Sequence, residues 1–224
     1  MTSSYKGNLK RALKLYFILG SANCMGRSPS KILTEAIEGG ITMFQFREKG
    51  TGALTGSEKY GLAEELQNIC KKASIPFIVN DDIELALALH ADGIHIGQDD
   101  EPAQLVRERM KGKILGISVH NMKEAQQAIS VGADYFGVGP IFPTSTKEDT
   151  NDVQGVKVIS EFRTNGITIP IVGIGGITGE NAASVIEAGA DGVSVITAIS
   201  QAENVQIAAS RIRENISSHG TKIK

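Results

Sequence analysis

The stretch Ile41-Thr42-Met43-Phe44-Gln45-Phe46-Arg47-Glu48-Lys49 begins like a buried β-strand and ends in charged residues. Strand side chains alternate between two faces, so one face carries two phenylalanines and the other carries Gln45, Arg47 and Lys49. Cations brought toward the mouth of a closed sheet are costly unless an anion meets them there. The alternative is a strand that runs into a solvated loop with ordinary surface charges. Which anion would bind depends on the rest of the chain.

The composition is that of an ordinary globular protein. The 224 residues have a formal net charge of −2, and 41% are hydrophobic and 21% charged. These values give no support for a nucleic-acid-binding surface. Cys24 and Cys70 are too few and too isolated for a disulfide framework or a zinc site. Because the sequence shows neither a signal-peptide core nor an apolar run of membrane length, we expect a cytoplasmic protein with no nucleic-acid or membrane partner. Oligomeric state cannot be predicted from these features.

Short apolar segments alternate with helical segments along the chain. Strands are predicted at residues 15–19, 41–49, 76–80, 93–97, 114–118, 135–139, 170–175 and 192–196. Strict alternation favours a parallel sheet, and eight units suit closure into a barrel. We therefore predict a single domain over 1–224, a (β/α)8 TIM barrel at about 14–216 with a short N-terminal extension at 1–13 and a tail at 217–224. The alternative, an open doubly wound sheet, would lack a dinucleotide-binding fingerprint after its first strand.

Helices are expected between these strands from apolar spacing and capping residues. The predicted helical segments are 30–38, 62–73, 82–89, 102–111, 121–131, a segment ending at 162, 181–188 and 202–216. Three junctions from helix to strand repeat one pattern, Ala-Asp followed by Gly or Tyr, at residues 91–93, 133–135 and 190–192. This repetition supports one regular architecture without an internal domain boundary.

Glycines and small polar residues follow the seventh and eighth predicted strands, as Gly175-Gly176 and Ile196-Thr197-Ala198. The active site of such a barrel lies at the carboxyl ends of its strands, and the loops after strands seven and eight frequently bind phosphate through backbone N–H groups. The alternative is that the paired glycines only form a tight turn. We predict a phosphate-binding cup from these two loops.

Asp81 and Asp100 follow the third and fourth predicted strands, which are neighbours. Two carboxylates with few other ligands suit Mg²⁺, which keeps several waters and takes phosphate oxygens. The alternative is that each aspartate caps a helix, Asp81 with Glu84 and Asp100 ahead of Pro102. As a pair facing cations, they are predicted to bind the metal.

The loop between residues 140 and 152 is long and polar, and it contains Thr144, Thr146 and Lys147. Loops of this length often serve as lids over an active site. Lys147 could equally be an exposed, flexible lysine. His95 lies within a strand, where it is at least as well explained as a hydrogen-bonded core residue as a base, and it is given no catalytic role.

At these residues the chain resembles the thiamine phosphate synthase family over about 15–216. The resemblance rests on five motifs in order: Gln45-Phe46-Arg47-Glu48-Lys49, Asn80-Asp81, His95-Ile96-Gly97-Gln98, the segment 139–147 from Gly139-Pro140 to Thr146-Lys147, and Gly173-Ile174-Gly175-Gly176-Ile177. The family joins 4-amino-2-methyl-5-hydroxymethylpyrimidine diphosphate to hydroxyethylthiazole phosphate and releases pyrophosphate. The resemblance therefore implies a transferase.

The resemblance also implies roles for individual residues. Those expected to hold the pyrimidine diphosphate are Gln45, Arg47, Lys49, Asn80, Ser118 and Lys147, with Arg47, Lys49 and Lys147 as the catalytic cations. Asp81 and Asp100 would bind Mg²⁺. Those expected to hold the thiazole phosphate are Thr144, Thr146, Gly176, Ile196 and Thr197. Thr197 replaces a serine that is more usual in the family, but its hydroxyl and backbone N–H both remain.

The chemistry of these side chains agrees with a dissociative substitution. Cations and Mg²⁺ stabilise the charge that grows on the diphosphate leaving group. The thiazole nitrogen attacks with its own lone pair, so no general base is required. Three alternatives remain open: a thiazole tautomerase on the same barrel, another phosphate-binding barrel such as a sugar-phosphate epimerase or isomerase, and a non-catalytic sensor of thiamine intermediates. The tautomerase would not need the diphosphate-binding cations.

Overall fold

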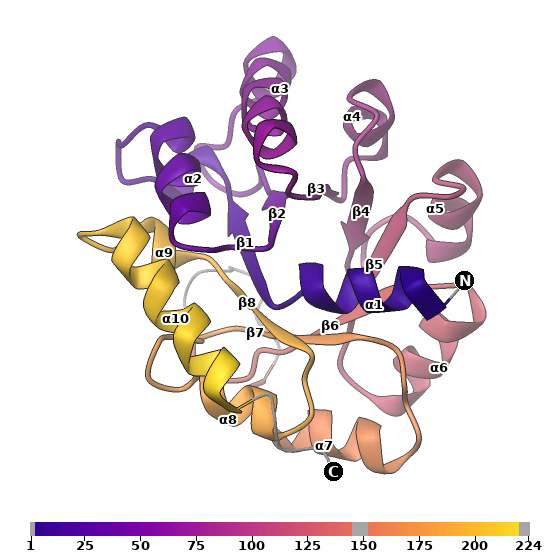
Figure 1. The fold of residues 1–224 in the computed structure, drawn as a ribbon. Helices are drawn as coiled ribbons and strands as arrows, with labels where there is room; N and C mark the ends of the chain where they lie inside the picture. Colours follow the sequence, from indigo (N-terminus) through magenta and orange to yellow (C-terminus); the bar gives the residue numbers. More distant parts are fainter. Residues whose placement is uncertain (1–2, 145–151, 220–224) are drawn as a thin grey trace.

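The computed structural model describes residues 3–144 and 152–219. Its centre is a closed barrel of parallel strands in the order β1 to β8, surrounded by helices (Figure 1). The strands are β1(Leu15–Leu19), β2(Met43–Phe46), β3(Phe77–Asn80), β4(Gly93–Ile96), β5(Ile114–Val119), β6(Tyr135–Val138), β7(Ile171–Ile174) and β8(Gly192–Val195). Leu15 pairs with Val193, which closes the ring between the first and last strands. The predicted (β/α)8 TIM barrel is confirmed.

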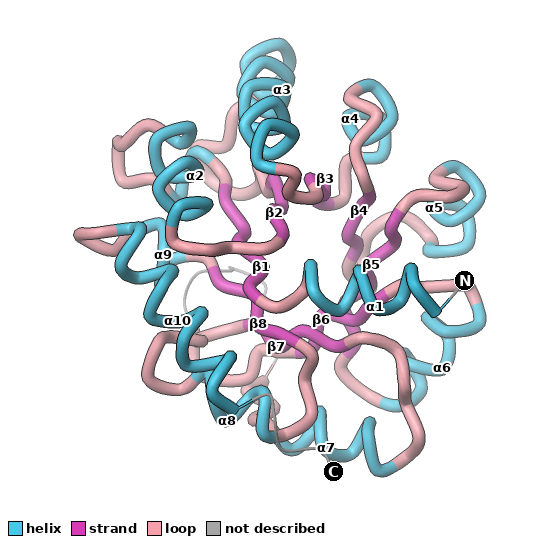
Figure 2. The backbone as a smooth tube through the Cα atoms, viewed as in Figure 1, coloured by secondary structure: helices cyan, strands magenta, loops and turns pink. Residues whose placement is uncertain are grey.

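The helices alternate with the strands, as Figure 2 shows by colour. They are α1(Ser3–Ala12), the 3-10 turn η1(Ser21–Asn23), α2(Pro29–Glu38), α3(Gly56–Ala73), α4(Ile83–Ala88), α5(Ala103–Arg109), α6(Met122–Ser130), α7(Lys157–Thr164), α8(Ala182–Glu187), α9(Thr197–Ser200) and α10(Val205–His219). Four boundaries differ from the prediction by three residues or more. Helix α3 begins at Gly56 rather than Leu62, and α10 ends at His219 rather than Ile216. The second strand ends at Phe46 rather than Lys49, and the last helix begins at Val205 rather than near Ala202. The short helix α9 was not predicted, because four residues are too few for a periodic pattern.

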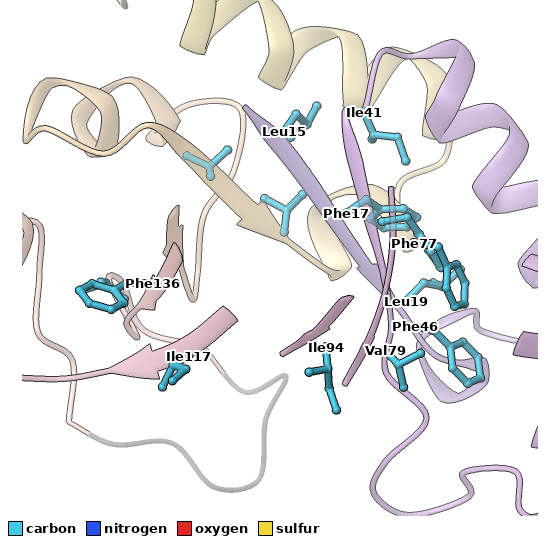
Figure 3. Packing of buried hydrophobic residues seen from close by; sticks show 14 of the residues in the cluster. Leu15, Phe17, Leu19, Ile41, Phe46, Phe77, Val79, Ile94, Ile117 and Phe136 are labelled. Carbon is cyan, nitrogen blue, oxygen red and sulfur yellow. The ribbon is translucent and has the colours of Figure 1, made fainter. Parts of the chain in front are cut away.

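Alternation along each strand divides the core into two layers. Side chains such as Phe17, Phe44 and Phe136 point outward to the helices and belong to one large buried cluster, part of which is seen in Figure 3. Inside the barrel, a second cluster forms around Tyr16 and Tyr135. Outward faces of a parallel barrel are covered by helices, so they are apolar throughout, whereas the interior can accept polar groups near its mouth.

Helix α1 closes the amino-terminal end of the barrel. Leu9 is buried near the end of this helix, and Leu13 is buried directly after it. Both pack in the interior cluster against Tyr16, Met43 and other inward residues. The predicted N-terminal extension therefore covers the end of the barrel opposite to the one where catalytic residues of this fold are found.

The repeated aspartates lock neighbouring strands together at the same end. The Asp92 carboxylate accepts a hydrogen bond from the Phe77 N–H at 2.8 Å. Asp134 accepts from the Leu115 N–H at 2.8 Å, and Asp191 accepts from the Ile171 N–H at 3.0 Å. Each aspartate thus ties the start of one strand to the start of the strand before it. The repeat has a structural role, which agrees with the stabilising function of this end of the barrel.

Candidate active site

The residues predicted for the pyrimidine diphosphate begin at the carboxyl ends of β2 and β3. Gln45 lies in β2 and Arg47 directly follows it, while Asn80 is the last residue of β3. Gln45 pairs in register with Ile78, so Asn80 lies two residues further along the same inner face. In the described residues, the Arg47 side chain has no ion-pair or hydrogen-bond partner and is half-buried. Among the described residues, it is therefore a cation at the barrel mouth that no carboxylate neutralises.

Asp81 and Asp100 converge on a single ammonium group. The Lys49 Nζ lies 2.5 Å from Asp81 Oδ2 and 3.3 Å from Asp100 Oδ1. The Lys49 side chain is 45% exposed, whereas the two carboxylates are 22% and 20% exposed. The structure therefore brings both predicted metal ligands to one point, where a positive charge already sits between them.

Neither aspartate caps a helix, so that alternative is wrong. The cap of α4 is Asp82, whose side chain accepts a hydrogen bond from the Leu85 N–H at 2.9 Å. The cap position of α5 is Pro102, and Asp100 instead accepts from the Gly97 N–H at 2.7 Å. Asp81 adopts a left-handed backbone with φ of 61°, a conformation that is uncommon outside glycine and clusters at functional sites. The Asp81 carboxyl group forms a hydrogen bond with Asp100 instead of capping the helix.

The two carboxylates hold protons unequally. Burial, followed by the hydrogen bond with Asp100, raises the pKa of Asp81 to about 6. Burial also acts upward on Asp100, but hydrogen bonds from Asp81 and the Gly97 N–H keep its pKa below the ordinary value. The hydrogen bond to Asp81 raises the pKa of Lys49. Two close carboxylates that repel each other favour a bound proton or cation, and the pair titrates as a unit.

The donor set fits Mg²⁺. Carboxylate oxygens are the hard ligands that this ion prefers, and it needs only one or two of them when substrate phosphates and waters complete the shell. Within residues 3–144 and 152–219, no cluster of three or more His, Cys, Asp or Glu side chains could hold a metal. A site of two carboxylates is thus suited to an ion that arrives with its substrate. The Lys49 ammonium shows that a cation can sit between them.

A cavity of about 330 Å³ opens at the carboxyl ends of strands β5 to β8. Its walls contain Thr144, Gly176, Ile196 and Thr197, which are four of the residues predicted for the thiazole phosphate. The structure therefore brings these four together, although they come from three separate loops. Thr146 and Lys147 lie outside the described residues, so the prediction for these two is untested. Ser118, which was predicted on the pyrimidine side, also lines this cavity.

Two glycines shape the wall of the cavity. Gly175 and Gly176 have φ values of +97° and +62°, which side chains disfavour. A Cβ at Gly176 would lie 2.5 Å from the Pro143 carbonyl oxygen, so even alanine would collide with backbone there. Both glycines line the cavity, and neither carries a side chain that would keep a ligand away from the backbone. The short helix α9 starts opposite, at Thr197, and the N–H groups of a first helical turn have no partners within the helix. This is the arrangement predicted for a phosphate cup.

The buried carboxylate of Glu48 was missed by the sequence reasoning. It accepts hydrogen bonds from the Ser21 N–H at 2.8 Å and the Ser21 hydroxyl at 2.5 Å. It also accepts from the Leu54 N–H at 2.8 Å. Glu48 thereby fixes the loops after β1 and β2 and holds the flanking residues Arg47 and Lys49 toward the site. The alternation that placed Phe44 and Phe46 on the outer face could have indicated this direction for Glu48.

The barrel interior holds a second group that the sequence did not reveal. Tyr16 and Tyr135 are fully buried, and their hydroxyl groups lie 2.9 Å apart. His95 contacts the Tyr135 hydroxyl through Nδ1 at 3.0 Å and the Ser118 hydroxyl through Nε2 at 3.0 Å. His95 is thus the hydrogen-bonded core residue that was considered. Nothing in the separate segments of sequence indicates that two tyrosines from β1 and β6 meet there.

Comparison with known proteins decides which family has this site. The model of the family described as thiamine monophosphate synthase matches residues 15–199. A thiamine-phosphate synthase of Bacillus cereus (strain ATCC 10987 / NRS 248) is 60% identical over 224 residues, which is 100% of both chains. The chain belongs to the thiamine monophosphate synthase family. The predicted family is confirmed, and with it a transferase of thiamine biosynthesis.

Other members of the thiamine monophosphate synthase family agree. A thiamine-phosphate synthase of Bacillus thuringiensis (strain Al Hakam) is 60% identical over 217 residues, covering 97% of this chain and 99% of that protein. The solved thiamine phosphate pyrophosphorylase from Pyrococcus furiosus superposes with a TM-score of 0.83 at 33% identity, over 94% of this chain and 98% of that one. In the ranges 3–144 and 152–219, no helix combines the length and apolar character needed to cross a membrane.

Proposed function

We propose that the protein joins 4-amino-2-methyl-5-hydroxymethylpyrimidine diphosphate to hydroxyethylthiazole phosphate, giving thiamine phosphate and pyrophosphate. The observation that carries this assignment is the division of one barrel mouth into two halves. One half has the carboxylate pair with Lys49 and Arg47, whose side chain has no partner among the described residues. The other is the glycine-walled cavity of about 330 Å³. A diphosphate with its metal suits the first half, and a monophosphate ester suits the second.

Asp81 and Asp100 are the residues that would hold Mg²⁺, because their oxygens converge on one cation. When bound, the ion supplies charge stabilisation for diphosphate oxygens. Arg47, Lys49 and Lys147 act on the same group, since their positive charges match the negative charge that grows on the leaving diphosphate. Gln45, Asn80 and Ser118 hold the pyrimidine, and Ser118 also lines the cavity of the second half.

A dissociative path removes the need for a general base. The aminopyrimidine can bear positive charge once the carbon–oxygen bond to the diphosphate breaks. The thiazole nitrogen then forms the new bond with its own lone pair, so no proton has to be removed before the attack. Thr144, Thr146, Gly176, Ile196 and Thr197 position the thiazole phosphate for this step. The cytoplasmic location, the absence of nucleic-acid or membrane partners and the lid role of Lys147 stay predictions.

One experiment separates the synthase from the tautomerase and the sensor. Purified protein is supplied with MgCl₂ and both substrates, and thiamine phosphate and pyrophosphate are measured together. We expect the two products in equal amounts. If neither appears while the thiazole phosphate alone is isomerised, the protein is a tautomerase. Binding of both ligands without any turnover would identify a sensor. Retention of Arg47, Lys49 and the acid pair supports the synthase, because a tautomerase does not need to bind a diphosphate.

A further inference from the structure

A continuous chain of hydrogen bonds crosses the barrel interior beneath the site. The Gln45 side-chain amide donates to the Tyr16 hydroxyl at 2.8 Å, and the Tyr16 and Tyr135 hydroxyls are 2.9 Å apart. The chain continues from Tyr135 to His95 and from His95 to Ser118, both at 3.0 Å. Its five members come from β2, β1, β6, β4 and β5. It therefore joins two predicted substrate-binding residues, Gln45 and Ser118, through three residues that lie deeper in the barrel.

The barrel is shaped to hold this chain. A Cβ at Gly116 would lie 2.1 Å from the Tyr135 ring and 2.5 Å from His95 Nδ1. A Cβ at Gly137 would lie 3.0 Å from His95 Cε1. Glycines in β5 and β6 thus leave the room that the two rings occupy. Buried polar groups are costly unless all are satisfied, and apolar side chains would fill the space more simply. The energetic cost of burying this polar chain therefore indicates a role beyond packing.

The donors and acceptors give the chain a direction. Because Tyr16 accepts from the Gln45 amide, its own proton goes to the Tyr135 hydroxyl. Tyr135 then donates to Nδ1 of His95, so the histidine carries its proton on Nε2 and donates to the Ser118 oxygen. In the reverse order, the Tyr16 proton would face the Gln45 NH₂ group, which cannot accept it. Burial raises the pKa of both tyrosines, so both hydroxyls keep their protons.

We propose that Tyr16, Tyr135 and His95 are positioning residues that orient the two ends of this chain for the substrate. At one end, the Gln45 amide is held with NH₂ toward Tyr16, so its carbonyl oxygen is left to accept a hydrogen bond. At the other end, Ser118 accepts from His95, so its hydroxyl proton is left to donate into the cavity. The site thereby presents one fixed acceptor and one fixed donor, a pattern suited to an aminopyrimidine. This role rests on the proposed function.

The first test measures the proton position on His95 directly. The full-length protein is labelled with ¹⁵N-histidine, and the His95 signals are assigned by their loss in His95→Asn. We expect a protonated Nε2 and an unprotonated Nδ1 at pH 8 without substrate. In Tyr135→Phe, which removes the donor to Nδ1, we expect a mixture of the two tautomers. A protonated Nδ1 in the unmodified protein would overturn the proposal. This measurement does not depend on catalytic activity.

The second test measures catalysis in Tyr16→Phe and Tyr135→Phe. We expect each to lower kcat/KM for the pyrimidine diphosphate about 10- to 100-fold, as loss of partners that orient contacting groups does elsewhere. The KM for the thiazole phosphate should change less than twofold. The control is Tyr60→Phe, because Tyr60 is 39% exposed, and it should behave like the unmodified protein. Unchanged kinetics in both core variants would overturn the proposal. An inactive unmodified protein with the expected His95 tautomer would instead refute the proposed function.

Discussion

Replacing Lys49 by methionine should strengthen cation binding to the free protein, although it removes a predicted catalytic residue. Lys49 occupies the point at which Asp81 and Asp100 converge, with contacts of 2.5 Å and 3.3 Å. A divalent ion that binds both carboxylates has to displace this ammonium. Methionine keeps much of the length of the side chain but leaves the carboxylates without a competing charge. The free protein should therefore bind the ion more tightly once Lys49 is gone.

The expected change in cation affinity follows from the exposure of the Lys49 side chain. Ion pairs of partly exposed lysines contribute about 0.2 to 1 kcal/mol each, and the Lys49 side chain is 45% exposed. Two such contacts amount to about 1 kcal/mol, which corresponds to roughly a fivefold change in an equilibrium constant. We therefore expect Lys49→Met to tighten binding of Mn²⁺, a probe with the same oxygen preference, by about three- to tenfold. Calorimetric titration without substrate measures this change.

The matched control is Lys59→Met, which removes the same charge from a neighbouring ion pair. Lys59 contacts Asp82 at 2.8 Å, and Asp82 caps α4 rather than facing the acid pair. It should change Mn²⁺ affinity by less than about twofold, because only screened long-range charge is lost. When pyrophosphate is added with the ion, the effect of the substitution should reverse: Lys49→Met should bind pyrophosphate more weakly than the unmodified protein does. An unchanged or weaker Mn²⁺ affinity in Lys49→Met would refute the reasoning.

Three further predictions follow from the same site. Burial raises the pKa of Asp81 to about 6, so the native state loses stability as pH rises from about 4 to 6. Asp81→Asn should therefore raise the unfolding temperature, measured by calorimetry in EDTA, by about 2 to 6 °C at pH 8 and by less at pH 5. A smaller gain at pH 8 than at pH 5 would contradict this sign. Gly176→Ala places a Cβ 2.5 Å from the Pro143 carbonyl and should raise the KM for the thiazole phosphate at least about tenfold in steady-state assays. Gly166→Ala, with a similar positive φ but open space around it, should leave that KM unchanged. Glu48→Gln should lower the free energy of unfolding in urea by about 1 to 3 kcal/mol, since one of the two oxygens that accept from backbone N–H groups becomes an NH₂ group, which cannot accept. An unchanged urea midpoint would exclude this anchoring role.

Much of the fold could be predicted because each unit of the barrel leaves a local pattern. The first strand was predicted at 15–19 and is Leu15–Leu19, because its uniformly apolar run lies between Lys14 and Gly20. The helix beginning at Asn121 was predicted from its capping residues, and the Asn121 side chain does accept from the Glu124 N–H. The eightfold alternation then left few topologies to choose from. Local sequence patterns therefore predict each of the eight strands and their order in the closed sheet.

The site was less predictable, because its contacts join distant segments. Asp81 and Asp82 are adjacent and chemically identical, yet the backbone turn with φ of 61° at Asp81 makes one a site residue and the other a cap. That turn cannot be read from residue type alone. The Tyr16–Tyr135 contact joins residues 119 positions apart, and its partners are set by barrel register rather than by any motif. Sequence patterns indicated which residues reach the mouth of the barrel, but not how they pair there.

The two ends of the barrel use aspartate in opposite ways. At the amino-terminal end, Asp92, Asp134 and Asp191 each accept a hydrogen bond from the backbone of a neighbouring strand. Their role there is structural, although burial also raises the pKa of Asp134, whose Oδ1 has no partner among the described residues. At the carboxyl end, the pKa of Asp81 is raised to about 6 because burial and Asp100 oppose its charge. Such a group destabilises the free protein at neutral pH and gains a favourable partner only when a cation binds. The ion pair with Lys49 reduces this destabilisation in the free protein. The same lysine is placed to contact the diphosphate once an ion takes its position, so binding of metal and substrate would be coupled through it.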